Sequence, residues 1–140
     1  IIFVPTYLDY VRVRNFLHAE HREFYAELCE YTPLKEQRKA LGQFTDGERS
    51  ILITTERFYF FKRYFVKLAE CLVFYSPPIF PDYYQQLIHK LQHESPNASV
   101  MSIYCKYDAL ELQRVVGTER ALQLLTREAA AYAFVTGGSN

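Results

Sequence analysis

Short runs of apolar residues alternate along this sequence with longer amphipathic stretches, and this alternation limits the possible folds more than any other feature. Residues 1–4, 50–55, 71–76 and 98–105 form apolar runs, and residues 24–32 form an alternating run. Amphipathic stretches cover residues 7–21, 33–47 and 81–94. Strands that are apolar at consecutive positions are typical of parallel sheets covered on both faces. The sequence therefore predicts the α/β class, with a parallel β-sheet flanked by helices, and two short helices over 108–117 and 118–129.

The first amphipathic stretch is expected to be a helix with one buried stripe. Its apolar spacing places Leu8, Val11, Asn15 and Ala19 near that stripe. Arg12 and Arg14 then lie outside the stripe, where they are available to a partner.

Length, composition and charge fit one globular domain over residues 1–140. The 140 residues are 49% hydrophobic and have a formal net charge of +0, so no overall positive field favours nucleic acid. RNA binding would need local basic patches or a partner chain. No stretch approaches the roughly 20 apolar residues of a membrane span, and we expect no signal peptide in these residues. Because the chain opens inside an apparent central strand without Met, we expect it to be a fragment of a longer protein.

Motifs for cofactor, metal or nucleophile chemistry are not found in the sequence. Neither GxxxxGK[ST] nor GxGxxG occurs, so no cofactor is expected. His89 and His93 have i, i+4 spacing but no third ligand, which favours a solvent-facing helix over a metal site. The cysteines, Cys29, Cys71 and Cys105, form no CxxC and are expected to be reduced and buried.

The segment ILITTERFYFFKRY, residues 51–64, is the strongest local anomaly. An apolar run passes through Thr54-Thr55-Glu56-Arg57 into clustered aromatic residues with Lys62 and Arg63. Aromatic rings can stack on unpaired bases while basic side chains reach phosphates. The alternative is a helix whose aromatic residues enter the core while its basic residues face solvent. Residue type alone favours the helix.

Four segments together resemble the carboxyl-terminal domain of the digestive organ expansion factor family. They are IIFVPTYLDYVRVRNFL, ILITTERFYFFKRY, LVFYSPPIFPDYYQQLI and IYCKYDALELQRVVGTERA, in order over nearly the whole chain. That family comprises nucleolar U3 small nucleolar RNA-associated proteins of the small-subunit processome and looks like a DEAD-box helicase without its catalytic motifs. The resemblance implies a second RecA-like domain, with the Pro5-Thr6 strand end as helicase motif IV.

The resemblance also identifies two segments that depart from an active helicase. In motif V, Thr55 matches the threonine of active DEAD-box enzymes. Glu56 replaces their aspartate, and Phe58 to Phe61 occupy the place of their Arg-Gly pair. Motif VI corresponds to DYYQQLIHKL, where active enzymes have arginines that stabilise charge on the transferred phosphate. Those arginine positions fall on Gln86 and His89, or on Leu87 and Lys90 in a register shifted by one. Neither register supplies a guanidinium, which implies that the domain does not hydrolyse ATP.

The resemblance thus implies a non-catalytic, helicase-like scaffold of the nucleolar small-subunit processome. Its expected partners are pre-ribosomal RNA or the U3 small nucleolar RNA particle and other processome proteins, with no membrane and no metal. The residues expected to bind RNA or a partner are Thr55, Glu56, Arg57, Lys62, Arg63, Tyr64, Arg12 and Arg14. Glu56 could instead pair with an internal arginine. Two alternatives remain: an active ATP-dependent RNA helicase whose nucleotide site lies mainly in a missing first RecA domain, and a protein-docking domain without RNA contact.

Overall fold

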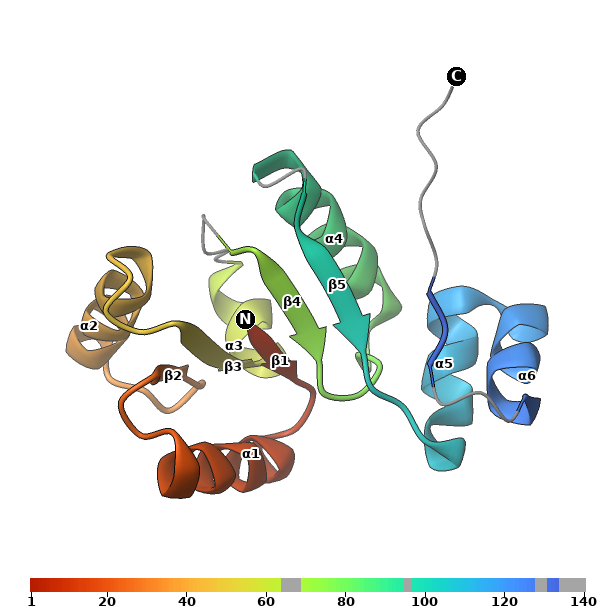
Figure 1. The fold of residues 1–140 in the computed structure, drawn as a ribbon, viewed down its shortest axis with the longest axis horizontal. Coiled ribbons are helices and arrows are strands. Elements are labelled where there is room, and N and C mark those ends of the chain that lie inside the picture. Colours follow the sequence, from red (N-terminus) through yellow and green to blue (C-terminus); the bar gives the residue numbers. More distant parts are fainter. Residues whose placement is uncertain (64–68, 95–96, 128–130, 134–140) are drawn as a thin grey trace.

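The structure, a computed structural model, describes residues 1–63, 69–94, 97–127 and 131–133. Strands and helices alternate along the chain (Figure 1). The strands are β1 (Ile2–Val4), β2 (Tyr25–Leu28), β3 (Ile51–Thr55), β4 (Cys71–Phe74) and β5 (Ser99–Ser102). The helices are α1 (Tyr7–Glu20), α2 (Leu34–Thr45), α3 (Glu56–Lys62), α4 (Pro81–Glu94), α5 (Ala109–Val116) and α6 (Thr118–Thr126), with a short 3-10 turn at Lys106–Asp108.

All five strands belong to one parallel sheet in the order β2-β3-β1-β4-β5. The first strand therefore lies in the middle of the sheet, with Phe3 paired in register with Thr54 on one side and Phe74 on the other. A parallel pair needs a crossover connection, and a helix or a longer segment lies between consecutive strands. The predicted α/β architecture is confirmed.

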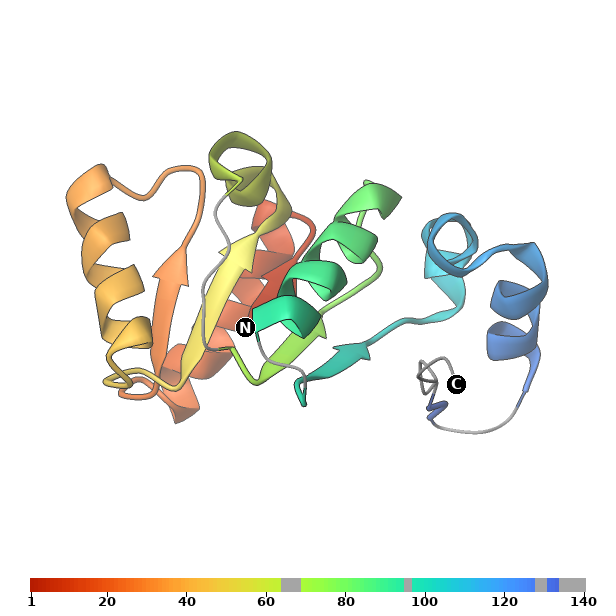
Figure 2. The same cartoon turned by 90° about the horizontal axis from the view of Figure 1, so that it is seen from above.

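In β1, β2 and β3, the side chains of neighbouring residues enter two different cores. On one face, Val4 and Ile53 pack with Tyr10 and Leu17 of α1. On the other face the packing helices are α2, α3 and α4, which meet residues such as Phe3, Leu52 and Phe74. This gives three layers, visible from above in Figure 2. The helices α5 and α6 form a separate small cluster beyond β5, around Leu112, Ala121 and Leu124.

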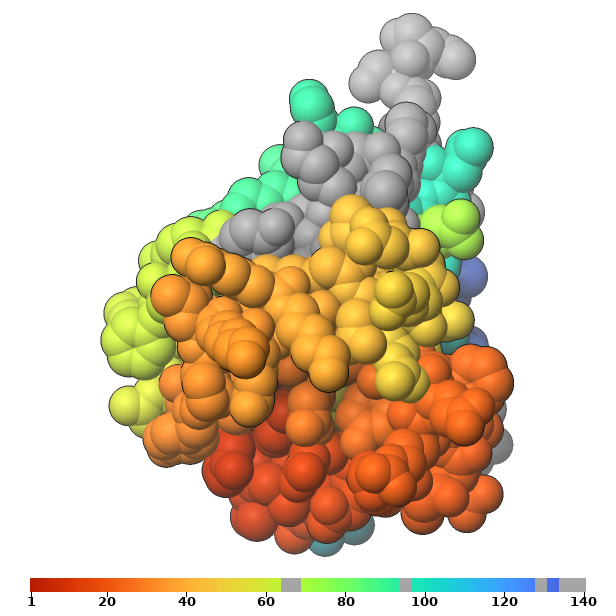
Figure 3. Space-filling view, turned by 90° about the vertical axis from the view of Figure 1, so that its left-hand side faces the viewer, coloured from red at the N-terminus to blue at the C-terminus, as the bar shows by residue number. Residues whose placement is uncertain are grey.

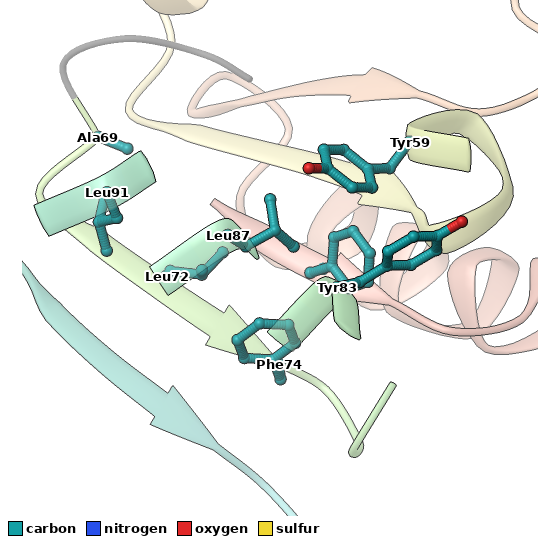
Figure 4. Close-up of a cluster of buried hydrophobic side chains, with 8 residues drawn as sticks. Tyr59, Ala69, Leu72, Phe74, Tyr83, Leu87 and Leu91 are labelled. Carbon is teal, nitrogen blue, oxygen red and sulfur yellow. The ribbon is translucent and has the colours of Figure 1, made fainter. Parts of the chain in front are cut away.

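The largest core cluster joins α3 and α4 to the centre of the sheet. Figure 4 shows Tyr59 of α3 and Tyr83 of α4 side by side above Leu72 and Phe74. The two tyrosine rings meet edge to face with centroids 5.2 Å apart, and both residues are buried. An edge-to-face pair of this kind adds to the stabilisation from apolar burial. The start of α4 is thereby fixed against α3.

The buried stripe expected for the first helix is wrong for Leu8, Asn15 and Ala19, which are exposed, whereas Val11 is half-buried and packs against the core. Tyr10 and Leu17 are the buried residues of the helix, and Leu8 is 63% exposed. Tyr10 and Leu17 are seven positions apart, about two helical turns, so they share the face that meets the sheet. Leu8 lies on a different face, where the sheet does not cover it.

The last strand and the cysteines also differ from expectation. The apolar run 98–105 forms a strand only over Ser99–Ser102, at the edge of the sheet, with side chains that are exposed or half-buried. Cys29 is buried as expected, but Cys71 is half-buried and Cys105 is exposed. An edge strand lacks the covering that buries a central one, so Cys105 beyond it is not a core residue. No helix in the described part of the chain is long and apolar enough to cross a lipid bilayer.

Candidate binding surface at the carboxyl edge of the sheet

The carboxyl ends of the strands lie at one edge of the sheet because every strand runs in the same direction. Val4 pairs in register with Thr55, so Pro5-Thr6 and the start of α3 leave the sheet at the same level. The segment after β4 leads to Ile79 and Phe80 at this same edge. Parallel sheets place their binding loops at this edge. The side chains there decide what the surface can bind.

Thr55 ends β3 and caps the start of α3. Its Oγ1 accepts a hydrogen bond of 3.1 Å from the backbone N–H of Phe58 and donates one of 2.8 Å to Oε2 of Glu30. The residue is only 1% exposed. A hydroxyl at this position satisfies one of the N–H groups that the first turn of a helix leaves free. Thr55, predicted to contact RNA or a partner, has its hydroxyl in two internal bonds.

Glu56 is buried and holds the loop before α4. Its carboxylate accepts hydrogen bonds from the backbone N–H of Ile79, at 3.0 Å, and of Phe80, at 2.8 Å. Burial raises the pKa of Glu56 above its ordinary value, and the two amides oppose that shift. The alternative that Glu56 pairs with an arginine is wrong, because its partners are backbone amides. Like Thr55, it is turned towards the protein.

The basic residues predicted for this segment are exposed. The guanidinium carbon of Arg57 lies 5.8 Å from the centre of the Phe61 ring. Arg63 lies over two rings, 5.8 Å from Phe60 and 5.2 Å from Tyr83. Within the described residues, Arg57, Lys62 and Arg63 form no salt bridge. Tyr64, also predicted as a contact, lies outside the described residues.

The aromatic residues of α3 divide between the core and the surface. Phe58 and Tyr59 are buried, whereas Phe60 is 47% and Phe61 is 61% exposed. The prediction of a helix is confirmed, but the expectation that its aromatic residues fill the core is wrong for Phe60 and Phe61. A helix of seven residues can turn only part of its surface to the sheet, so consecutive residues cannot all be buried.

Phe80 extends the exposed aromatic residues of α3 into the next loop. Its ring lies nearly parallel to that of Phe60, with centroids 6.5 Å apart, and Phe80 is 53% and Ile79 44% exposed. Together these residues form what we call the aromatic–basic surface: Arg57, Phe60, Phe61, Lys62, Arg63, Ile79 and Phe80. Sequence reasoning missed Ile79 and Phe80. The available signal was an apolar pair between Pro77-Pro78 and Pro81, where a loop would be expected to be polar.

Arg12 and Arg14 do not belong to this surface. Arg12 pairs with Asp9 one helical turn before it, with Nη1 and Oδ1 3.2 Å apart. Arg14 donates from Nε to Oε2 of Glu27, at 2.7 Å. Both arginines are on α1, which covers the sheet face opposite to α3. The sequence grouped them with the basic residues of α3, and the structure separates the two sets.

The α4 residues that the sequence resemblance predicts to correspond to helicase motif VI have varied environments. Gln86 and His89 are exposed, and Leu87 is buried. Lys90 donates from Nζ to the hydroxyl of Tyr59, at 3.2 Å. Arg63, which directly follows α3, donates from Nη1 to Oε1 of Gln86, at 3.3 Å, so a guanidinium from the segment predicted to correspond to motif V contacts this helix. In the described ranges, no three His, Cys, Asp or Glu side chains are grouped to hold a metal ion.

Comparison with known families places the chain. The family model described as "Utp25, C-terminal domain" matches residues 1–134. The chain belongs to the Utp25 C-terminal domain family. The resemblance to nucleolar U3-associated proteins found in the sequence is thereby confirmed.

Curated relatives of this Utp25 domain come from animals, plants and fungi. The "U3 small nucleolar RNA-associated protein 25 homolog" of Xenopus tropicalis is 40% identical over 98% of the chain, and "Protein NUCLEOLAR FACTOR 1" of Arabidopsis thaliana is 33% identical over 96%. The "U3 small nucleolar RNA-associated protein 25" of Kluyveromyces lactis is 31% identical over 96%. The chain spans only about a fifth of these relatives, 18% of the first two and 20% of the third.

Solved structures similar to this Utp25 domain have the RecA-like fold. A chain in the crystal structure of the E. coli DEAD-box protein SrmB bound to regulator of ribonuclease activity A has a TM-score of 0.67 at 18% identity, over 81% of this chain and 65% of that one. The C-terminal part of the Fun30 ATPase domain has a TM-score of 0.61 at 11% identity, over 92% and 39%. These likenesses confirm the predicted RecA-like fold.

Proposed function

We propose that this chain is a non-catalytic RecA-like module that acts as a scaffold in a U3 small nucleolar RNA-associated particle. The particle is the nucleolar small-subunit processome, which processes pre-ribosomal RNA and assembles the small ribosomal subunit. The names of the relatives, which refer to U3 small nucleolar RNA and to the nucleolus, support this setting. The module contributes binding surface, and ATP turnover is not part of its role.

The internal hydrogen bonding of Thr55 and Glu56 is the observation that supports a scaffold over an ATP-hydrolysing domain. A catalytic domain would need polar groups at the carboxyl edge of the sheet that can reach a ligand. Thr55 and Glu56 are 1% and 2% exposed, and their side chains are bonded to Glu30, Phe58, Ile79 and Phe80. A buried, fully bonded group gives up those bonds before it can take others, which costs free energy. The exposed Arg57, Lys62 and Arg63 remain for RNA or partner contacts.

The test of catalysis uses purified full-length protein with ATP and RNA. We expect no RNA-stimulated ATP turnover above the rate without RNA. RNA-stimulated turnover that disappears in a Thr55→Val, Arg63→Ala variant would instead support the active-helicase alternative, since both changes lie in this domain. Turnover unaffected by these changes would place the activity elsewhere in the protein and leave the scaffold role of this domain in place.

The test of the scaffold role is co-sedimentation with particles that contain U3 small nucleolar RNA. We expect the charge reversal Arg57→Glu, Lys62→Glu to reduce the co-sedimenting fraction of full-length protein several-fold. The matched control is Lys35→Glu, Lys39→Glu on α2, whose side chains are also exposed and which changes the net charge by the same amount. Equal loss in both variants would show that total charge, and not this surface, governs the association. Wild-type protein that never enters such particles would overturn the proposed function.

A further inference from the structure

The aromatic–basic surface exposes several large apolar side chains, whereas a helix face that only meets solvent is usually polar. Phe60, Phe61, Ile79 and Phe80 are each between 44% and 61% exposed and come from two segments. Large apolar side chains that gather on a surface are a mark of an interaction site, whereas single exposed ones are ordinary. In Figure 3 the yellow-green residues of α3 lie beside the orange α2 at the margin of the molecule.

Hydrogen bonds to Glu56 hold the two segments of this surface together. The carboxylate at the start of α3 binds the amides of Ile79 and Phe80, and the rings of Phe60 and Phe80 then lie nearly parallel. Tyr83, just after this loop, packs against Tyr59 on the inner side of α3. The outer side chains therefore stand on a backbone that is fixed before any partner arrives. A preorganised surface loses less entropy on binding.

The aromatic faces of Phe60 and Phe61 are partly covered by neighbouring side chains, which favours a protein partner over stacked bases. A base needs an open aromatic face. Guanidinium groups lie over Phe61 and Phe60, each at 5.8 Å, and Phe60 also has the ring of Phe80 beside it. Apolar side chains can instead pack against ring edges and the loop residue Ile79. Aromatic and arginine side chains together are the residue types that dominate binding energy at protein interfaces.

Charge sets the second requirement on the partner. Arg57, Lys62 and Arg63 border the apolar side chains without a salt bridge among the described residues. Of the carboxylates nearby, Asp82 in the first turn of α4 is exposed, Glu30 is half-buried and hydrogen-bonded to Thr55, and Glu56 is buried. The three exposed cations therefore outnumber the exposed carboxylate. Arginine offers a planar set of N–H donors that matches a carboxylate. The fitting partner has apolar or aromatic side chains close to Asp or Glu.

We propose that the aromatic–basic surface docks a segment of another protein that carries apolar or aromatic side chains next to acidic ones. This inference rests on the proposed scaffold function and names the partner class for its exposed surface. Phe60, Phe61 and Phe80 provide the apolar contact, and Arg57, Lys62 and Arg63 pair with the carboxylates.

Site-specific photocrosslinking tests this inference. Full-length protein with benzoylphenylalanine at position 61 is assembled into particles, irradiated and separated on a gradient, and the crosslinked partner is mapped at residue level. The control carries the same crosslinker at Leu122 of α6, which is 62% exposed, as Phe61 is at 61%. We expect position 61 to crosslink to a protein segment with acidic residues within a few positions of apolar ones, and position 122 to give no such product.

A synthetic peptide of the mapped segment then tests the chemistry. We expect Phe60→Ser, Phe61→Ser to weaken its binding to the full-length protein at least about tenfold, a loss typical of interface anchor residues. Arg57→Gln, Lys62→Gln should weaken it more at low salt than at high salt, because exposed ion pairs are screened. Leu110→Ser, Leu122→Ser, which removes exposed apolar side chains elsewhere, should leave it unchanged.

Three outcomes would overturn the inference. Crosslinks from position 61 to RNA would assign the surface to nucleic acid, crosslinks to a segment without acidic residues would remove the charge requirement, and no crosslink would show an unoccupied surface. In each of these cases, co-sedimentation with U3 small nucleolar RNA would leave the scaffold function standing. Wild-type protein that does not co-sediment with particles containing U3 small nucleolar RNA would overturn the scaffold function itself.

Discussion

The Glu56 carboxylate lies 2.8 Å from the backbone nitrogen of Phe80 and accepts a hydrogen bond from it. This bond links the first turn of α3 to a loop 24 residues later in the chain. A second bond from Ile79 supports it, and both are sheltered because Glu56 is 2% exposed. One acidic side chain thus sets the relative position of the two segments that form the aromatic–basic surface.

Glu56→Ala should destabilise the fold by about 2–4 kcal/mol, because two amides lose a charged acceptor worth roughly 1.5–3 kcal/mol each and only partly regain water. Urea denaturation measures the free energy of unfolding. Glu48→Ala, an exposed acidic residue, is the control and should change it by less than about 0.5 kcal/mol. A loss for Glu56→Ala as small as that of the control would mean that the two hydrogen bonds contribute nothing to stability.

The pH dependence of stability should also reveal Glu56. Burial raises its pKa in the folded state above the ordinary value of 4.5, so the folded state holds the proton more tightly than the unfolded state. The resulting stabilisation is complete below pH 4.5 and is lost as the pH rises through the raised pKa. Wild-type protein should therefore lose stability relative to Glu56→Gln as the pH rises above about 4.5 and through the raised pKa. Parallel unfolding curves for the two proteins would contradict the raised pKa.

Thr55→Val should cost about 1–2 kcal/mol, because it keeps the shape of the side chain but removes the hydroxyl that caps α3 and binds Glu30. Thr55→Ser keeps that hydroxyl and should stay within about 0.5 kcal/mol of wild type. Chemical denaturation of the two variants separates the hydroxyl from the methyl group. If Ser proves as damaging as Val, packing of the methyl group, and not capping, stabilises this position.

Arg63→Gly and Arg63→Ala should differ, although both remove the guanidinium. Arg63 ends α3 in the left-handed region, at φ 49° and ψ 24°. Glycine adopts that region without strain, whereas alanine keeps a cost of roughly 1 kcal/mol. Both variants lose the contacts to Phe60, Tyr83 and Gln86. Thermal unfolding should therefore rank glycine above alanine, and the reverse order would argue against a left-handed residue in solution.

The architecture could be predicted because a central strand is buried on both faces and is therefore apolar at consecutive positions in the sequence. Ile51–Thr55 falls inside the predicted run 50–55, and the central strands need no long-range information to be recognised. Segments at the margin of the sheet were predicted less well from the sequence. β5 has an apolar sequence but an edge position, and α1 buries Tyr10 where apolar spacing favoured Leu8. Both depend on what lies opposite in space, which local periodicity does not contain.

The candidate site was only half visible in the sequence for a related reason. Arg57, Lys62 and Arg63 stand out in a local window, and the structure places all three on the surface. That Thr55 and Glu56 turn inward depends on partners elsewhere in the chain: Glu30 lies 25 residues before Thr55. The end of α3 could not be predicted either. The residue that ends the helix in the left-handed conformation is usually glycine, which is recognisable in a sequence, but here it is Arg63.

The central place of β1 has a consequence for how this chain is made. Within this sheet it is synthesised before the other described strands, yet Ile2 pairs with Ile53 and Val73, about fifty and about seventy residues later. A nascent chain therefore displays an unpaired Ile-Phe-Val strand until Ile51–Thr55 has been translated. Pairing of β1 requires the closure of long loops, and such non-local pairing is slow compared with the formation of local contacts. Among the strands of this sheet, β1 is therefore the one that a chaperone would have to shield for the longest time during synthesis.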